Sequence, residues 1–104
     1  MSPPSDDPSA PDASGALTRV MKIVNEKGLH ARASAKFVQV VEKFDAQVSV
    51  SRLSESVGGN SIMGLMMLGA GIGTSITVKA TGAQAAEVIA ALDELVSNRF
   101  GEEE

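Results

Sequence analysis

Two stretches of the chain repeat their apolar residues at intervals of three and four, and this repeat limits the possible folds more than any other feature. Each stretch predicts an amphipathic helix with one apolar face. The first begins at Ala31 and carries its apolar residues at Ala33, Phe37, Val40, Val41 and Phe44. The second extends to Phe100 and carries them at Ala85, Val88, Ile89, Leu92, Leu95 and Val96. Both helices therefore need an apolar surface against which to pack.

The remaining segments supply strands for that surface. Residues 17–24 are apolar on most of both faces, residues 46–51 alternate between apolar and polar side chains, and residues 74–79 are rich in β-branched residues. Residues 52–60 predict a short neighbouring strand followed by a glycine turn. Residues 61–68 form a short, almost wholly apolar segment whose length suits two turns of helix.

The predicted order is β-α-β-β-α-β-α, an α+β fold in which helices cover one face of a small, mainly antiparallel sheet. With 104 residues the chain is long enough for one domain with a single two-layer core. All four prolines lie among Ser, Asp and Ala in the first eleven residues. Because such a segment buries little apolar area, we expect residues 1–15 to be a disordered acidic tail and residues 16–104 to be the folded domain.

Composition excludes several classes of function. The chain has one His and no Cys, Trp or Tyr, which removes disulfides, thiol chemistry, sulfur-based zinc sites and aromatic platforms for bases. Six of the 13 acidic residues lie before residue 13 or after residue 101, and seven acidic and nine basic residues remain between them. That weak positive charge is too small for a nucleic-acid interface.

Other features argue against a membrane, a cofactor and a metal. No apolar run approaches the roughly 18 residues of a membrane span, and no basic start followed by an apolar stretch marks a secretory signal. We therefore expect a cytoplasmic protein. The glycines of residues 69–73 follow a helix and precede a strand, which is the wrong order for a nucleotide-binding loop. We assign Glu87, Asp93 and Glu94 to solubility, because they form no metal-ligand group.

The junction before the first helix contains the only imidazole of the chain, in the sequence Gly28-Leu29-His30-Ala31-Arg32. His30 stands where a helix normally has a capping Ser, Thr, Asp or Asn. The free backbone N–H groups and the helix dipole at that end favour an anion, and the Arg32 guanidinium suits phosphate oxygens. A phosphorylated His30 would be stabilised there. The alternative is that His30 is an ordinary loop residue, Ser34 caps the helix, and the helix starts at Ala35.

Ser61 begins the short apolar segment. Either Asn60 or Ser61 is a good cap for a helix that starts there. A phosphate on Ser61 would also be tolerated at a helix N-terminus, and it would add about two negative charges beside an apolar surface. The two roles are compatible.

The short segment carries more apolar residues than one face of so short a helix can bury. They are Ile62, Met63, Leu65, Met66, Met67 and Leu68. Since methionine adapts to differently shaped partners, we expect part of this set to form an exposed docking patch near His30. The alternative is that all six residues belong to the core.

At these residues the chain resembles the HPr family, the histidine-containing phosphocarrier proteins of the bacterial phosphoenolpyruvate-dependent phosphotransferase system. The resemblance runs from about Leu17 to Phe100. Two motifs carry it, Gly28-Leu29-His30-Ala31-Arg32 and Ser61-Ile62-Met63-Gly64-Leu65-Met66, the second followed by Leu68-Gly69. The resemblance implies an HPr-like open-faced β-sandwich, with a four-stranded antiparallel sheet and helices on one face.

The resemblance also implies a function for these residues. His30 would accept phosphate on Nδ1 from enzyme I and pass it to an EIIA-type protein, and Arg32 would contact the phosphate. In some bacteria an ATP-dependent HPr kinase/phosphorylase modifies the serine that matches Ser61. The partner-binding residues would be Ile62, Met63, Met66 and Lys27. We expect a monomeric carrier that is not an enzyme and needs no cofactor.

Some residues depart from the family pattern. Ala33 stands where members often have Pro, although Ala supports a helix as well. Lys27 replaces a small polar residue and adds a cation near the phosphate. The Ala-Ser-Ala-Lys-Phe and Leu-Met-Met-Leu sequences are more similar to the nitrogen-related, regulatory branch than to the sugar-transport members.

Two further functions compete with the phosphocarrier. One is a regulatory binding module that acts through Ser61 and the Met-rich patch without a relay through His30. The other is a small metabolite-binding α/β domain, which the scarcity of aromatic residues and of converging polar groups disfavours.

Overall fold

The structure is a computed structural model that describes residues 16–102. The tail predicted for residues 1–15 lies outside the described residues. The elements, in chain order, are β1 (Leu17–Lys22), α1 (Ala31–Val41), β2 (Gln47–Arg52), β3 (Glu55–Gly58), α2 (Ile62–Met67), β4 (Ser75–Thr81), α3 (Ala85–Ser97) and the 3₁₀ turn η1 (Arg99–Gly101). Apart from the additional turn η1, this order is the one predicted.

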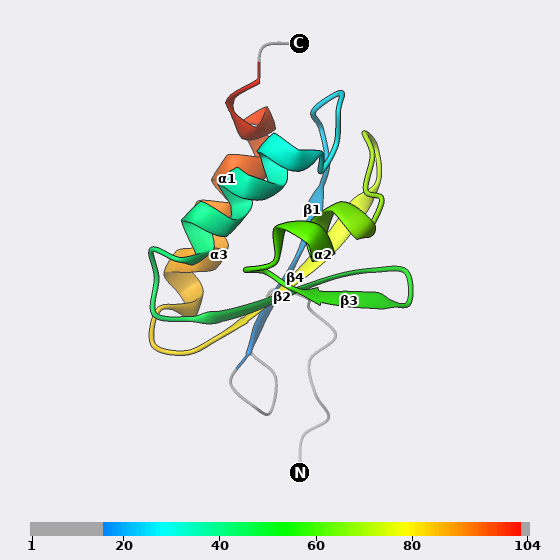
Figure 1. Cartoon of the computed structure of the whole chain (residues 1–104). Coiled ribbons are helices and arrows are strands. Elements are labelled where there is room, and N and C mark those ends of the chain that lie inside the picture. Colours follow the sequence, from blue (N-terminus) through cyan, green and yellow to red (C-terminus); the bar gives the residue numbers. More distant parts are fainter. Residues whose placement is uncertain (1–15, 103–104) are drawn as a thin grey trace.

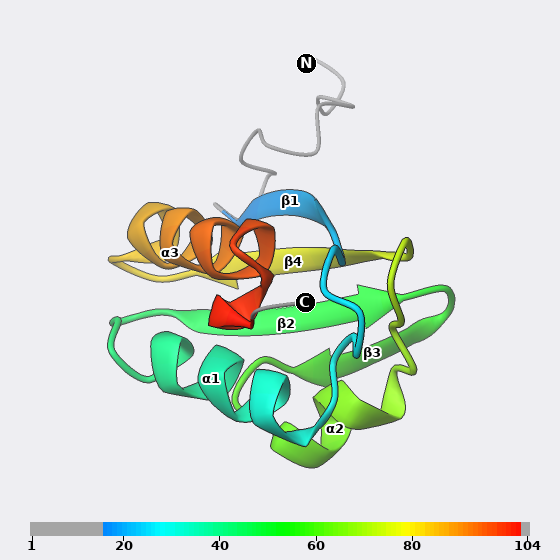
Figure 2. The ribbon, with the colours of Figure 1, turned by 90° about the horizontal axis from the view of Figure 1, so that it is seen from above.

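The four strands form one antiparallel sheet in the order β1-β4-β2-β3. All three helices lie on one face of it (Figures 1 and 2). Helix α3 packs on β1 and β4, α2 contacts β3, and α1 lies between the other two helices. The expectation of an α+β open-faced sandwich is therefore confirmed.

The core lies between the sheet and the helices, and the sequence periods explain it. In β2 and β4, alternate residues such as Val50, Ile76 and Val78 are fully buried, and they face apolar residues of the helices such as Phe37 and Leu92. Burying a side chain of this size stabilises the fold by about 1.5–3 kcal/mol. The apolar faces predicted from the sequence are thus the faces that hold the layers together.

Several element ends differ from the predicted ones. Strand β1 ends at Lys22 instead of residue 24, and β4 runs on to Thr81. Helix α1 ends at Val41, so Phe44 lies in the following loop, where it still packs partly buried against the core. A side chain can thus contribute to the core without belonging to the helix that its spacing predicted.

The end of α3 differs most from the prediction. The helix stops at Ser97 instead of continuing to Phe100, because Arg99 and Phe100 adopt left-handed backbone angles with φ of 57° and 54°. This turn directs the Phe100 side chain into the core, where it is 1% exposed. The apolar residue at the end of the predicted helix is buried as expected, but the backbone reverses to bury it.

One carboxylate assigned to solubility also has a partner. Asp93 of α3 accepts a hydrogen bond from Arg19 of β1 at 3.2 Å, and the two side chains are 45% and 39% exposed. This pair links α3 to the edge strand on which it packs. Since exposed ion pairs contribute about 0–1 kcal/mol, the apolar contacts remain the main source of stability.

The buried position of Phe100 yields a prediction. Phe100→Ala leaves a cavity in the core, so we expect it to lower the free energy of unfolding by about 3–5 kcal/mol. Leu53→Ala is the matched control, because Leu53 is 87% exposed and its truncation leaves no cavity. Chemical denaturation of both variants measures the difference. Equal effects of the two substitutions would contradict the placement of Phe100.

Candidate functional site

Helix α1 begins at Ala31, and His30 is its N-cap residue. The His30 backbone is extended, its carbonyl oxygen accepts the first helical hydrogen bond from Ser34 N at 2.9 Å, and its side chain caps nothing. The alternative in which Ser34 caps a helix starting at Ala35 is wrong. The buried Ser34 hydroxyl donates instead to the carbonyl oxygen of Leu29 at 3.1 Å.

This helix start favours an anion. The N–H groups of Ala31, Arg32 and Ala33 precede the first helical hydrogen bond and have no acceptor within the helix. They carry the positive end of the helix dipole, equivalent to about half an elementary charge. A negative group beside His30 would meet several N–H donors at once.

A cavity of about 600 Å³ opens beside this helix start. Its charged lining residues are Glu26, Lys27, Arg32, Lys36 and Glu102, and the His30 ring forms part of its wall. The Lys27 and Arg32 side chains are exposed, whereas Lys36 is half-buried. Positive side chains outnumber negative ones in this lining, and both Lys27 and Arg32 belong to it, beside His30.

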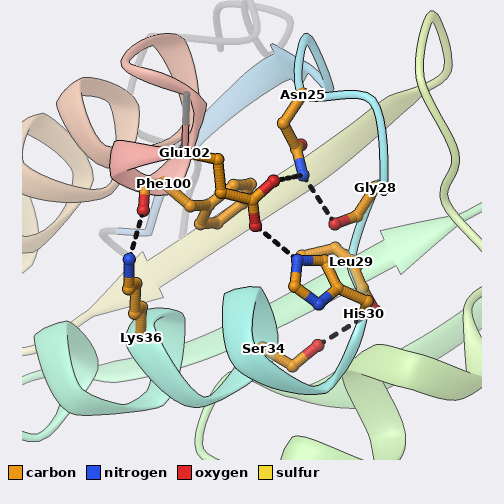
Figure 3. A network of polar contacts seen from close by, with 8 residues as sticks. All are labelled: Asn25, Gly28, Leu29, His30, Ser34, Lys36, Phe100 and Glu102. Atoms are coloured by element: carbon orange, nitrogen blue, oxygen red, sulfur yellow. Dashed lines mark hydrogen bonds and ion pairs between the residues drawn. The ribbon is translucent and has the colours of Figure 1, made fainter. Parts of the chain in front are cut away.

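The His30 ring has a partner that the sequence reasoning missed. Figure 3 shows the Glu102 carboxylate at His30 Nε2, and the other oxygen of that carboxylate at Asn25. Asn25 is fully buried, and its Nδ2 donates to Glu102 Oε1 at 3.1 Å and to the carbonyl oxygen of Gly28 at 2.9 Å. The His30 and Glu102 side chains are 28% and 14% exposed. The imidazole is therefore accessible on one side and held on the other.

Glu102 reaches this position because of the turn after α3. Lys36 Nζ of α1 donates to the carbonyl oxygen of Phe100 at 2.6 Å, which fixes the turn beside α1 (Figure 3). In the sequence, Glu102 is the first of three consecutive glutamates, and no local pattern distinguishes it as a site residue. Its contact with His30 joins residues 72 positions apart and depends on a left-handed turn that the helical spacing did not predict.

The loop before α1 rests on the loop after α2. Leu29 N donates to the carbonyl oxygen of Ala70 at 2.9 Å. Gly28 has φ of +65°, and a Cβ atom there would lie 2.3 Å from the same Ala70 oxygen. Only glycine allows this approach, because any side chain would collide with the backbone. The two sequence motifs thus meet through the loops that border them.

Ser61 caps α2. Its backbone is extended, and its Oγ accepts a hydrogen bond from Gly64 N at 3.0 Å. The side chain is half-buried. Gly64 fits tightly beneath it, since a Cβ atom there would approach Ser61 Oγ and the Val57 side chain to about 3 Å. The predicted capping role of Ser61 is confirmed.

Helix α2 also exposes an apolar surface, as predicted. Ile62, Met63, Met66 and Met67 are 40–74% exposed and are called the methionine patch below. The other two apolar residues of the segment, Leu65 and Leu68, are buried, so the alternative that all six lie in the core is wrong. A smaller hollow of about 250 Å³ is lined by both Met66 and His30, which brings the patch beside the imidazole.

Two features are absent from residues 16–102, a cluster of metal ligands and a membrane-spanning helix. Within that range, no group of three His, Asp or Glu side chains is placed to hold a metal ion. No helix in that range is long and apolar enough to span a bilayer.

Several known proteins are similar to this chain. Residues 17–98 match the family model described as "PTS HPr component phosphorylation site". Phosphocarrier protein HPr of Cupriavidus necator is 49% identical over 88 residues, which cover 85% of this chain and 99% of that protein. The protein of the same name from Pseudomonas aeruginosa is 52% identical over 83 residues, which cover 79% and 92%. The crystal structure of HPr-C-His from Thermoanaerobacter tengcongensis has a TM-score of 0.79 and 40% identity, over 84% of this chain and 98% of that one.

The cap of α2 yields a second prediction. Ser61→Ala removes the acceptor for Gly64 N, so we expect the free energy of unfolding to fall by about 1 kcal/mol. Ser61→Thr keeps the hydroxyl and is expected to lose less. Thermal or chemical unfolding measures both variants, and an Ala variant as stable as the wild type would argue against the cap.

Proposed function

Because the chain belongs to the HPr family, the phosphocarriers of the phosphotransferase system, we propose that His30 is the residue that carries the phosphoryl group. The observation that carries this proposal is the placement of the only imidazole of the chain at the open start of α1. The ring is partly exposed there, as contact with a donor and an acceptor requires. No residue of the chain other than His30 can form a phosphohistidine.

The geometry favours Nδ1 as the atom that takes the phosphate. Nε2 already faces the Glu102 carboxylate, whereas Nδ1 is turned away from it (Figure 3). In the transfer, the Nδ1 lone pair forms a bond to phosphorus while the bond from phosphorus to the donor breaks, and the donor keeps that electron pair. The same step in reverse, with a new acceptor, discharges the carrier.

The surroundings stabilise the phosphoryl group only moderately, which suits a carrier. Arg32 supplies a fork of N–H donors, Lys27 adds a point charge, and the N–H groups of α1 add their dipole. Since Arg32 and Lys27 are exposed, water and salt screen their attraction for the phosphate. A group held in this way can leave again. We therefore regard the protein as a carrier that is regenerated in each cycle, and not as an enzyme.

The proposed partners are enzyme I as donor and an EIIA-type protein as acceptor. Both must bring a phosphorus atom to the same ring nitrogen, so both must dock on the surface around His30. The methionine patch is the apolar surface next to that ring, since Met66 and His30 line one hollow. Flexible methionine side chains can adapt to two different partners. Lys27, Ile62, Met63 and Met66 are the proposed contact residues.

Ser61 is a proposed regulatory phosphorylation site, for an ATP-dependent kinase of the HPr kinase/phosphorylase type. Ser61 directly precedes the exposed Ile62 and Met63, so a phosphate on its Oγ would place about two negative charges at the edge of the methionine patch. The added charge would weaken the docking of partners while leaving the His30 side chain itself unmodified. This position favours a second candidate function, a regulatory binding module that acts through Ser61 and the patch.

The phosphorelay is tested with enzyme I and labelled phosphoenolpyruvate. We expect the protein to acquire an acid-labile, base-stable label, as a phosphohistidine does, and His30→Ala to acquire none. Circular dichroism confirms that the variant is folded. Label that persists in folded His30→Ala would overturn the proposal. Binding to a partner that is sensitive to Ser61 but not to His30 would favour the regulatory module instead.

The role of Arg32 is tested in the same assay. Arg32→Ala removes charge-assisted hydrogen bonds to the phosphate, so we expect phosphoryl transfer to slow by roughly tenfold or more. Arg32→Lys keeps the charge but not the fork and is expected to recover part of the rate. An Ala variant that transfers at the wild-type rate would exclude Arg32 from the site.

Another pair of variants tests whether charge at Ser61 affects docking. Ser61→Asp and Ser61→Asn both keep a good cap, but only Asp adds a negative charge. We expect Ser61→Asp to raise the KM of enzyme I for the carrier while kcat changes little, which is the pattern of weakened docking. Ser61→Asn is expected to behave like the wild type. Equal KM values for the two variants would show that charge at this position does not affect docking.

A further inference from the structure

We propose that Glu102 is a positioning residue of the carrier site: its carboxylate keeps the proton of the neutral His30 ring on Nε2 and so leaves the Nδ1 lone pair ready for phosphorus. This inference rests on the proposed function of His30. Glu102 lies 72 positions after His30 in the sequence and would act on the ring tautomer.

Hydrogen-bond donors and acceptors around the His30 ring decide which ring nitrogen carries the proton. An ionised carboxylate only accepts hydrogen bonds, and a neutral imidazole carries one N–H donor and one acceptor nitrogen. Glu102 Oε2 faces His30 Nε2, so the stable arrangement places the proton on Nε2. Nδ1 then keeps its lone pair. The opposite tautomer would direct two lone pairs at each other.

Contacts to its carboxylate and its backbone keep Glu102 from turning away from His30. Its Oε1 accepts a hydrogen bond from Asn25 Nδ2, and the same Nδ2 also donates to the carbonyl oxygen of Gly28 (Figure 3). Asn25 is fully buried, which fixes its amide. The backbone that carries Glu102 is fixed in turn by the buried Phe100 and by the hydrogen bond from Lys36. Both carboxylate oxygens therefore serve as acceptors in defined directions.

With the ring proton on Nε2, bonds, charges and protons balance during phosphoryl transfer. The lone pair of Nδ1 forms the new N–P bond, the bond from phosphorus to the donor breaks, and the donor keeps the electron pair. The His30 ring becomes positively charged, with phosphate on Nδ1 and the original proton on Nε2. Glu102 faces that proton and balances the new charge. When the phosphoryl group leaves, the electron pair returns to Nδ1 and the ring is neutral again, so no proton has to move in either direction.

The decisive variant is Glu102→Gln, because it keeps the shape of the side chain and changes one acceptor into a donor. Asn25 Nδ2 requires an acceptor, so the carbonyl oxygen of the substituted side chain should face Asn25 and its amide N–H₂ should face His30 Nε2. Turning the Asn25 amide over would bring its Oδ1 against the carbonyl oxygen of Gly28. The Gln variant therefore forces Nε2 to accept and moves the ring proton to Nδ1, where it blocks the nucleophile.

Two measurements test the effect of Glu102→Gln, one of the ring tautomer and one of the rate of phosphoryl transfer. Long-range ¹H–¹⁵N NMR spectra of the unphosphorylated protein report which ring nitrogen carries the proton. We expect Nε2–H in the wild type, a mixture in Glu102→Ala, and mainly Nδ1–H in Glu102→Gln. In the transfer assay we expect Glu102→Gln to be slower than the wild type by roughly tenfold and slower than Glu102→Ala, although Gln is the more conservative change.

Glu87→Gln is the matched control, because it makes the same change of charge on the exposed side of α3. We expect the wild-type tautomer and the wild-type rate for it. A merely structural role of Glu102 predicts the reverse order, with Ala more damaging than Gln, and that order would overturn the proposal. So would a ring proton that stays on Nε2 in Glu102→Gln. The NMR measurement needs no phosphoryl donor, so its result is independent of whether His30 carries phosphate.

Discussion

The free beginning of α1 is the constraint on which the site depends. A helix that starts with an ordinary cap has one of its N–H groups satisfied by the capping side chain. Here the residue in that position directs its ring elsewhere, and the N–H groups of the first turn stay available. This start costs some helix stability, and the core below α1 compensates, with Phe37 fully buried under the helix. The chain thus keeps a polar, anion-attracting helix end at its surface.

The geometry of that helix end depends on neighbours from other parts of the chain. Gly28 and Leu29 rest on the backbone at Ala70, so the loop that carries His30 cannot shift without the loop after α2. The same loop follows the methionine patch. A single set of backbone contacts therefore holds the imidazole and the apolar surface at a fixed spacing.

Much of the fold could be predicted from the sequence, because the relevant signals are local. The spacing of Ala33 and Phe37 predicts the face of α1, the alternation around Val50 predicts β2, and the unusual residue at position 30 predicts an open helix start. The hydroxyl of Ser61 likewise sits in a recognisable capping position. In each case the physical cause lies within a few residues of the feature, so the local sequence pattern is enough to predict that feature.

The contacts of Glu102 and Asn25 could not be predicted, because their cause is not local. They require Arg99 and Phe100 to leave the helical conformation, and that happens because burying Phe100 outweighs one more turn of α3. Nothing in the order of residues at the chain end signals this balance. For the same reason the sequence pattern placed Phe100 at the end of α3 and grouped Glu102 with its acidic neighbours, although the fold brings Glu102 to the imidazole instead.

The long separation between His30 and Glu102 has a consequence for the biosynthesis of the protein. A ribosome delivers the carboxylate 72 residues after the imidazole. Until Glu102 has been added, this carboxylate cannot lie at His30 Nε2. A translation product that stops before Glu102 therefore lacks the carboxylate that faces His30 Nε2.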